Sequence, residues 1–189
     1  MDEVKERPPP QTVRRVDAER NRQRIVTAAR GVFADPGGEM SMAEVARRAG
    51  VGSATLYRNF ASRRELLEAL YTDDIDAVCH AAAAVDPSAA GLEDWLRRFY
   101  TYFRGKRLVA TELLQHADED APVFGAGRTR ILQAGQPLLV AAQNSGGVRD
   151  DLSIRQVIDM VAAIGNISGD DSYCQPILQA ALDALRQGR

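Results

Sequence analysis

The chain is poor in the residues that build metal and covalent sites. Its 189 residues contain two cysteines and two histidines. The cysteines, Cys79 and Cys174, are far apart and form no Cys-x-x-Cys pair, which argues against a zinc knuckle and against a disulfide framework. We therefore expect no metal site, no cofactor and a reducing compartment, the cytoplasm.

Long apolar runs and catalytic signatures are also missing. The longest apolar runs, such as residues 81–85, are far shorter than the ~18 residues that a membrane-spanning helix needs, and no basic segment followed by an apolar one opens the chain. Neither Gly-x-x-x-x-Gly-Lys, His-Glu-x-x-His nor Gly-x-Ser-x-Gly occurs. These absences predict a protein that has no membrane partner, has no catalytic residues and is not an enzyme.

Lysine is absent from residues 11–64, where every basic residue is an arginine. This segment holds eleven arginines against five acids, a net charge of +6, which leaves −8 for the rest of a chain whose total is −2. A basic N-terminal third on an acidic remainder is typical of a protein with one end that meets a polyanion. A solvated arginine-rich surface fits the same charge, so the spacing of the residues has to distinguish it from a surface that binds a polyanion.

What the sequence does contain is helical periodicity. Apolar residues recur every three or four positions, as Ile25, Ala29 and Val32 do, and no alternating strand pattern occurs. We predict an all-α protein of about nine helices. The predicted parts are a disordered N-terminal arm (residues 1–16), a three-helix domain (residues 17–64) and a larger helical domain (residues 65–189).

Two short helices near the N-terminus form a helix-turn-helix candidate. A capping box at Ser41 opens the first, a glycine-bearing turn follows, and the second covers residues 53–59. Leu56 and Phe60 lie four residues apart and are expected to face inward. The outward face then carries groups that bind phosphates and base edges, namely Ser53, Ala54, Thr55, Tyr57 and Arg58. An ordinary three-helix subdomain without a nucleic-acid partner fits the same spacing.

The run from Met42 to Phe60 resembles the DNA-binding signature of the tetracycline-repressor (TetR) family. Residues 24–29 are similar to the family's first helix and residues 64–67 to the start of its fourth. Three positions depart from the usual pattern, because Gly52, Asn59 and Ala61 stand where serine, histidine and proline are common. Glycine is a tolerable N-cap and asparagine still donates to phosphate, so these changes modify contacts and keep the fold.

The resemblance implies a transcriptional repressor that binds double-stranded DNA as a homodimer. Two such domains, roughly 34 Å apart, would enter successive major grooves of a near-palindromic operator. The predicted DNA-binding residues are Ser41, Arg47, Gly52, Ser53, Ala54, Thr55, Tyr57, Arg58, Asn59, Arg63 and Arg64. An all-α enzyme or a protein-interaction bundle without DNA binding is the alternative.

The resemblance also assigns dimerisation to the last two helices, here predicted over residues 153–167 and 173–186. Each carries an apolar stripe at helical spacing. The predicted interface residues are Ile154, Val157, Ile158, Val161, Ile164, Ile177, Leu178, Ala181, Leu182 and Leu185. A helix pair buried only within its own subunit fits the same stripes.

A small-molecule effector is the third partner that the resemblance implies, bound in the larger domain. Candidate lining residues belong to an aromatic helix, to the end of the next helix and to a proline that is expected to kink or split the helix over residues 123–143. They are Trp95, Phe99, Tyr102, Phe103, His116 and Pro137. An aromatic stripe at helical spacing also fits a hydrophobic core.

Overall fold

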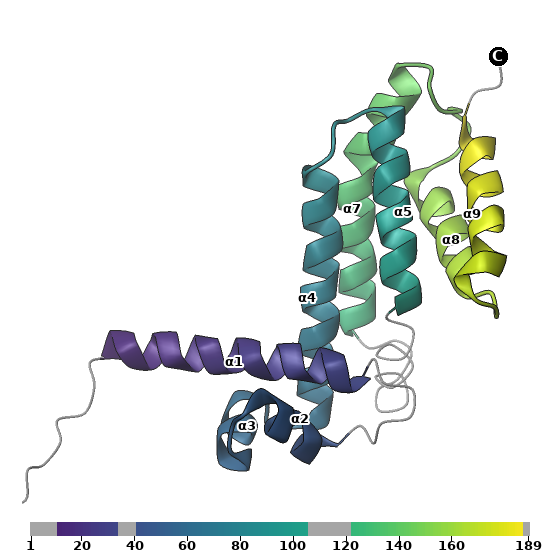
Figure 1. Ribbon diagram of the computed structural model, residues 1–189. Coiled ribbons are helices and arrows are strands. Elements are labelled where there is room, and N and C mark those ends of the chain that lie inside the picture. The colour runs from purple at the N-terminus through teal and green to yellow at the C-terminus, as the bar shows by residue number, and fades with distance from the viewer. Residues whose placement is uncertain (1–10, 34–40, 106–121, 187–189) are drawn as a thin grey trace, which may run out of the picture. The chain divides into compact units, whose positions relative to one another are not determined.

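The computed structural model of the chain describes residues 11–33, 41–105 and 122–186, in which every regular element is an α-helix (Figure 1). The prediction of an all-α fold is confirmed. The predicted helix that ends near His116 lies outside the described residues. The helices are α1 (Gln11–Phe33), α2 (Met42–Ala49), α3 (Ser53–Asn59), α4 (Arg63–Ala83), α5 (Ala89–Gly105), α7 (Pro122–Asn144), α8 (Ile154–Gly165) and α9 (Asp171–Leu185).

The chain divides into two compact units between Leu70 and Tyr71, which we call the head and the body. The division falls six residues after the predicted boundary, because the first turns of α4 carry leucines that are buried within the head. These are Leu66, Leu67 and Leu70. Helix α1 also begins earlier than predicted, at Gln11, so residues 11–16 are helical instead of part of a disordered arm.

The head is built from one apolar face of each of its helices. Helix α1 packs against α2 and α3, and α2 packs against α3. Ile25 and Val45 are at most 1% exposed, and Leu56 and Phe60 are fully buried. Burying these side chains fixes the orientation of the short α3, since a helix of two turns has little stability of its own.

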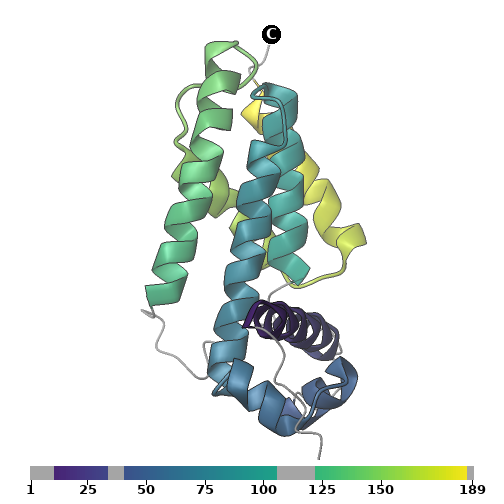
Figure 2. The same cartoon turned by 90° about the vertical axis from the view of Figure 1, so that its left-hand side faces the viewer.

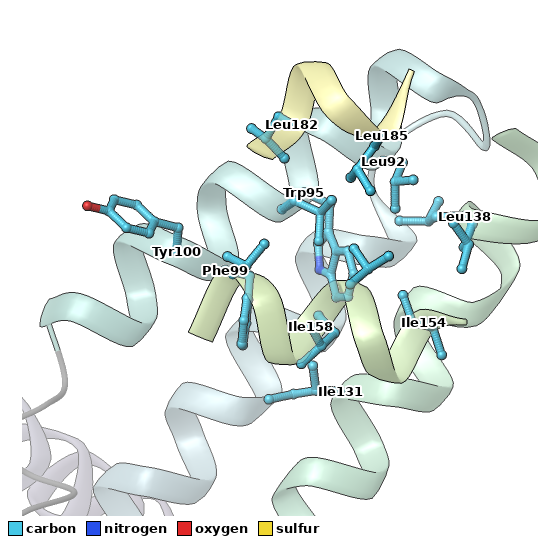
Figure 3. Close-up of a cluster of buried hydrophobic side chains, with 14 of the residues drawn as sticks. Leu92, Trp95, Phe99, Tyr100, Ile131, Leu138, Ile154, Ile158, Leu182 and Leu185 are labelled. Atoms are coloured by element: carbon cyan, nitrogen blue, oxygen red, sulfur yellow. The ribbon is translucent and has the colours of Figure 1, made fainter. Parts of the chain in front are cut away.

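In the body, α5 packs against α7 and α8, while α8 also packs against α7 and α9 (Figures 1 and 2). Trp95 of α5 lies among the buried side chains of these helices (Figure 3) and is fully buried. Its indole Nε1 donates a hydrogen bond to the Val78 carbonyl at 3.1 Å. Gly135 of α7 makes room for the indole ring, because a Cβ atom there would lie 2.3 Å from it.

Helix α7 runs through Pro137 as a single α-helix, so the proline does not split it, which was one of the two predicted outcomes. Proline removes one backbone N–H and leaves the carbonyl four residues earlier without its helical partner. Both Pro137 and Gln133, which carries that carbonyl, are exposed. Water can therefore bind the freed carbonyl, and the helix persists.

Most of the predicted interface residues lie inside the body, where the subunit's own helices cover them. Ile177 and Ala181 are half-buried against the core. The others are at most 7% exposed and belong to the core of α5, α7, α8 and α9. They are Ile154, Val157, Ile158, Val161, Ile164, Leu178, Leu182 and Leu185. These stripes build the subunit itself, so a partner would have to use the other faces of α8 and α9.

No helix in the described part of the chain is long and apolar enough to cross a membrane. The same residues contain no group of three histidines, cysteines or acids that could hold a metal ion.

Candidate nucleic-acid interface

The turn between α2 and α3 depends on a glycine. Ser41 caps the start of α2, where its Oγ accepts a hydrogen bond from the Glu44 N–H at 3.1 Å. Gly50 ends α2 with φ 63° and ψ 38°, a left-handed conformation that residues with a Cβ avoid. A Cβ atom at Gly50 would also lie 2.7 Å from the Arg24 guanidinium. The chain can therefore turn sharply at this point and begin α3.

Helix α3 is held from its inner side and at its C-terminal end. Leu56 and Phe60 point into the head and are fully buried. The Arg22 guanidinium of α1 lies over the Phe60 ring, 4.4 Å from its centroid, and its Nη1 donates to the Asn59 carbonyl at 3.4 Å. Cation–π contacts of this kind add to the burial of the ring. These anchors leave the opposite face of α3 open to solvent.

The outward face of α3 carries hydrogen-bonding side chains. Ser53, Ala54 and Arg58 are exposed, and Tyr57 is 52% exposed. Thr55 is half-buried, and its Oγ1 accepts a hydrogen bond from Arg58 Nη2 at 2.9 Å. A short helix with this combination of small, hydroxyl, aromatic and guanidinium groups fits the major groove of DNA.

An acidic side chain on α2 binds two of the head's arginines. Glu44 accepts hydrogen bonds from Arg47 Nε and Arg48 Nε, each at 2.7 Å. The hydrogen bonds from Arg47 and Arg48 lower the Glu44 pKa from 4.5 to about 2. Arg47 is therefore exposed but paired, and it must leave Glu44 or share it before it can bind a phosphate.

The start of α4 places its two predicted arginines differently. The Arg63 guanidinium is half-buried and lies 5.9 Å from the centroid of the Phe33 ring. Arg64 is exposed and its Nε donates to Glu68 Oε1, one turn further on, at 2.8 Å. Arg63 thus contributes to the packing of the head, whereas Arg64 projects from its surface.

Two protein-family models match the chain in order. Residues 25–70 match the model of bacterial regulatory proteins of the tetR family, and residues 86–188 match the C-terminal domain of SbtR-like transcriptional regulators. The second match covers more than half of the chain. The chain belongs to the TetR family.

Solved structures of other TetR proteins share the fold over nearly the whole chain. A TetR transcriptional regulator of Streptomyces coelicolor is 31% identical, with a TM-score of 0.71, over 89% of this chain and 99% of that one. A TetR regulatory protein of Mycobacterium vanbaalenii is 26% identical, with a TM-score of 0.66, over 92% and 99%. No curated protein sequence matches. The protein is a transcriptional regulator with a DNA-binding helix-turn-helix and is not an enzyme.

In this TetR regulator, only some of the predicted DNA-binding residues lie together on the exposed face of the head. Ser53, Ala54, Tyr57 and Arg58 share the outward side of α3, with Gly52 exposed at its start. Ser41 and Asn59 are half-buried, and both serve the backbone, since Asn59 Nδ2 donates to the Thr55 carbonyl at 2.8 Å. The contacts of Arg22 with Phe60 and Asn59 were not predicted. Their signal in the sequence was a basic residue three positions before Ile25, in line with the apolar stripe of α1.

The predicted effector-binding residues of this TetR protein differ in how far they are buried. Trp95 and Phe99 are at most 2% exposed and belong to the core, with ring centroids 6.3 Å apart. Tyr102 and Phe103 at the end of α5 are half-buried, and Pro137 is exposed. His116 lies outside the described residues.

Proposed function

We propose that this regulator is a repressor that binds a near-palindromic operator through α3 and acts in the cytoplasm, where chromosomal DNA is found. The observation that carries the proposal is the outward face of α3. It exposes Tyr57 and Arg58 on a helix whose inner side is fully buried. An exposed tyrosine next to an arginine on a two-turn helix serves no packing role in the head, and it matches what base and phosphate contacts require.

To test this, duplexes that bind the full-length chain are selected from a random pool, and the enriched sequence is identified. We expect an inverted repeat whose half-sites lie about one or a multiple of one helical turn apart. A selected sequence without two-fold symmetry would contradict the operator proposal, and failure to enrich any sequence would contradict specific DNA binding.

For the homodimer, we infer that the partner covers the outward faces of α8 and α9. Family membership supports dimerisation, and the apolar residues on these faces support the location. They lie three or four residues apart within each helix and are exposed or half-buried: Met160 and Ala163 on α8, and Tyr173, Ile177, Ala180 and Ala184 on α9. Covering them with a second copy removes apolar surface from water.

For the effector, we propose a small molecule bound in the body near the C-terminal end of α5. Tyr102 and Phe103 are half-buried there at the edge of the core, whereas Trp95 and Phe99 lie inside it. A molecule that prefers the conformation unable to bind DNA would release the repressor by its difference in affinity for the two states. A screen for compounds that raise the melting temperature of the protein tests this proposal. A Phe103→Ala variant should no longer show the rise in melting temperature with a compound that binds there.

A further inference from the structure

A second basic surface lies on the head, away from the outward face of α3. It is an open groove of about 400 Å³ between α1 and α2. Three arginines line it, Arg20 and Arg24 from α1 and Arg48 from α2, together with the side chains of Gln23 and Thr27. None of the residues that line the groove is acidic. The groove therefore presents hydrogen-bond donors and positive charge to whatever enters it.

The charge of the groove comes mainly from α1. Arg20 and Arg24 lie one helical turn apart and are exposed, and in the described part of the chain neither forms an ion pair. Arg48 contributes less, because its Nε is 2.7 Å from Glu44 Oε1. Two neighbouring guanidinium groups without a carboxylate between them repel each other and favour a bound anion.

The groove lies next to the turn that leads into α3. Arg24 Nη2 donates to the Gly50 carbonyl at 3.4 Å, and Gly50 is two residues before Gly52, which caps the N-terminal end of α3. An arginine that reaches this turn lies beside the end of the helix that enters the major groove first in helix-turn-helix proteins.

We propose that the α1–α2 groove binds backbone phosphates of duplex DNA that flank the base pairs contacted by α3. The proposal rests on the proposed function, and it adds a partner surface that the recognition helix does not contain. Arginine, glutamine and threonine side chains donate to phosphate oxygens. The groove is open along its length, which suits a sugar–phosphate backbone better than a small enclosed ligand.

Phosphate contacts predict a particular signature in solution. They strengthen binding to every sequence alike, and each one lost makes the slope of log K against log salt less steep by about 0.9. Base contacts by α3 behave differently, since their loss lowers the ratio between selected and random duplexes.

The test compares the full-length chain with an Arg20→Ala/Arg24→Ala variant on two probes, a duplex selected by the unaltered chain and a random duplex of equal length. We expect the variant to bind both duplexes about tenfold or more weakly, with the ratio between them unchanged and a shallower salt slope. An Arg98→Ala/Arg149→Ala variant removes two exposed arginines of the body and controls for net charge. An equal effect in this control, or an unchanged salt slope in the groove variant, would overturn the proposal.

A second readout alters the DNA as well as the protein. Methylphosphonate groups that replace single phosphates outside the bases contacted by α3 should weaken binding by the unaltered chain, and not by the groove variant. If the unaltered chain binds every methylphosphonate duplex as tightly as the unmodified duplex, the groove proposal is wrong. If Arg58→Ala abolishes selectivity while the groove variant binds normally, the proposed function stands and the groove proposal fails; if neither substitution matters, both fail.

Discussion

Arg58 and Thr55 act as a pair on the outward face of α3, because Arg58 Nη2 donates to Thr55 Oγ1 at 2.9 Å. One turn of helix separates the two residues, and the hydrogen bond holds the long arginine side chain along the helix surface. A guanidinium restrained in this way loses less conformational freedom when it binds a base or a phosphate.

Arg58→Ala should lower the affinity for a selected duplex by about 5- to 150-fold, equivalent to about 1–3 kcal/mol for a base contact. The melting temperature should not change, because Arg58 is exposed. Fluorescence anisotropy with a labelled duplex measures the affinity. Arg58→Lys is the matched control, since it keeps the charge and loses the planar fork; if it binds like the unaltered chain, Arg58 contacts phosphate instead of a base.

Glu44→Gln should strengthen binding to random duplexes by several-fold. The carboxylate pairs with Arg47 and Arg48, so its removal ends both of these pairings and also removes a negative charge that repels phosphate. Anisotropy at two salt concentrations tests this. Weaker binding by Glu44→Gln would mean that Glu44 holds the arginines in the position that DNA requires.

The Glu44 carboxylate should titrate near pH 2 and not near its ordinary 4.5, because the hydrogen bonds from Arg47 and Arg48 stabilise its charged form. The folded-state pKa is lowered, so the stabilisation from this pairing is complete above about pH 4.5 and is lost as the pH falls through about 2. Carbon NMR of the labelled side chain reports the pKa directly. In an Arg47→Ala variant it should rise, and an unchanged value would show that Arg47 does not pair in solution.

Ala180→Glu should convert the dimer into monomers that remain folded. Ala180 is exposed on the outward face of α9, so the glutamate would be buried only when a second copy covers that face. Light scattering measures the mass. Ala126→Glu on the exposed side of α7 is the matched control, and a stable Ala180→Glu dimer would place the interface elsewhere.

Deletion of α8 and α9 is a poor test of the dimer interface, because it would also remove core residues such as Val157 and Leu178.

Gly135→Ala should lower the free energy of unfolding of the body by about 1–3 kcal/mol, the cost of overpacking a core. The added methyl group would lie 2.3 Å from the rigid Trp95 ring. Gly125→Ala in the same helix is the control, since nothing lies within 4 Å of a Cβ atom there. That variant should be more stable by up to about 1 kcal/mol, as alanine favours a helix over glycine. Urea unfolding of both variants checks the difference, and equal stabilities would contradict the packing of Trp95.

Periodicity and capping identify the three helices of the head, although α1 begins at Gln11, earlier than predicted. Ser41 caps α2, the glycine turn lies at Gly50, and Leu56 and Phe60 are buried as their spacing indicates. The pairing of arginines was not predictable in the same way, because Glu44 can reach Arg47, Arg48 or solvent. Only the side-chain geometry shows that it binds both arginines.

In the body, an apolar stripe at helical spacing does not say what covers it. The stripe that contains Val157 and Leu178 is covered by the subunit's own helices, and the same spacing would serve a dimer interface equally well. Trp95 shows the same ambiguity, since an aromatic side chain suits both a ligand pocket and a core. Trp95 can pack in the core because Gly135, distant in the sequence, leaves room for its ring.

Sequence recognition by α3 is tested most directly by the ratio of the affinities for a selected and a random duplex. This ratio is measured at two salt concentrations for the unaltered chain and for Arg58→Ala. We expect a high ratio for the unaltered chain and a lower ratio for the variant, with the random duplex affected less than the selected one. An identical ratio in both proteins would contradict it.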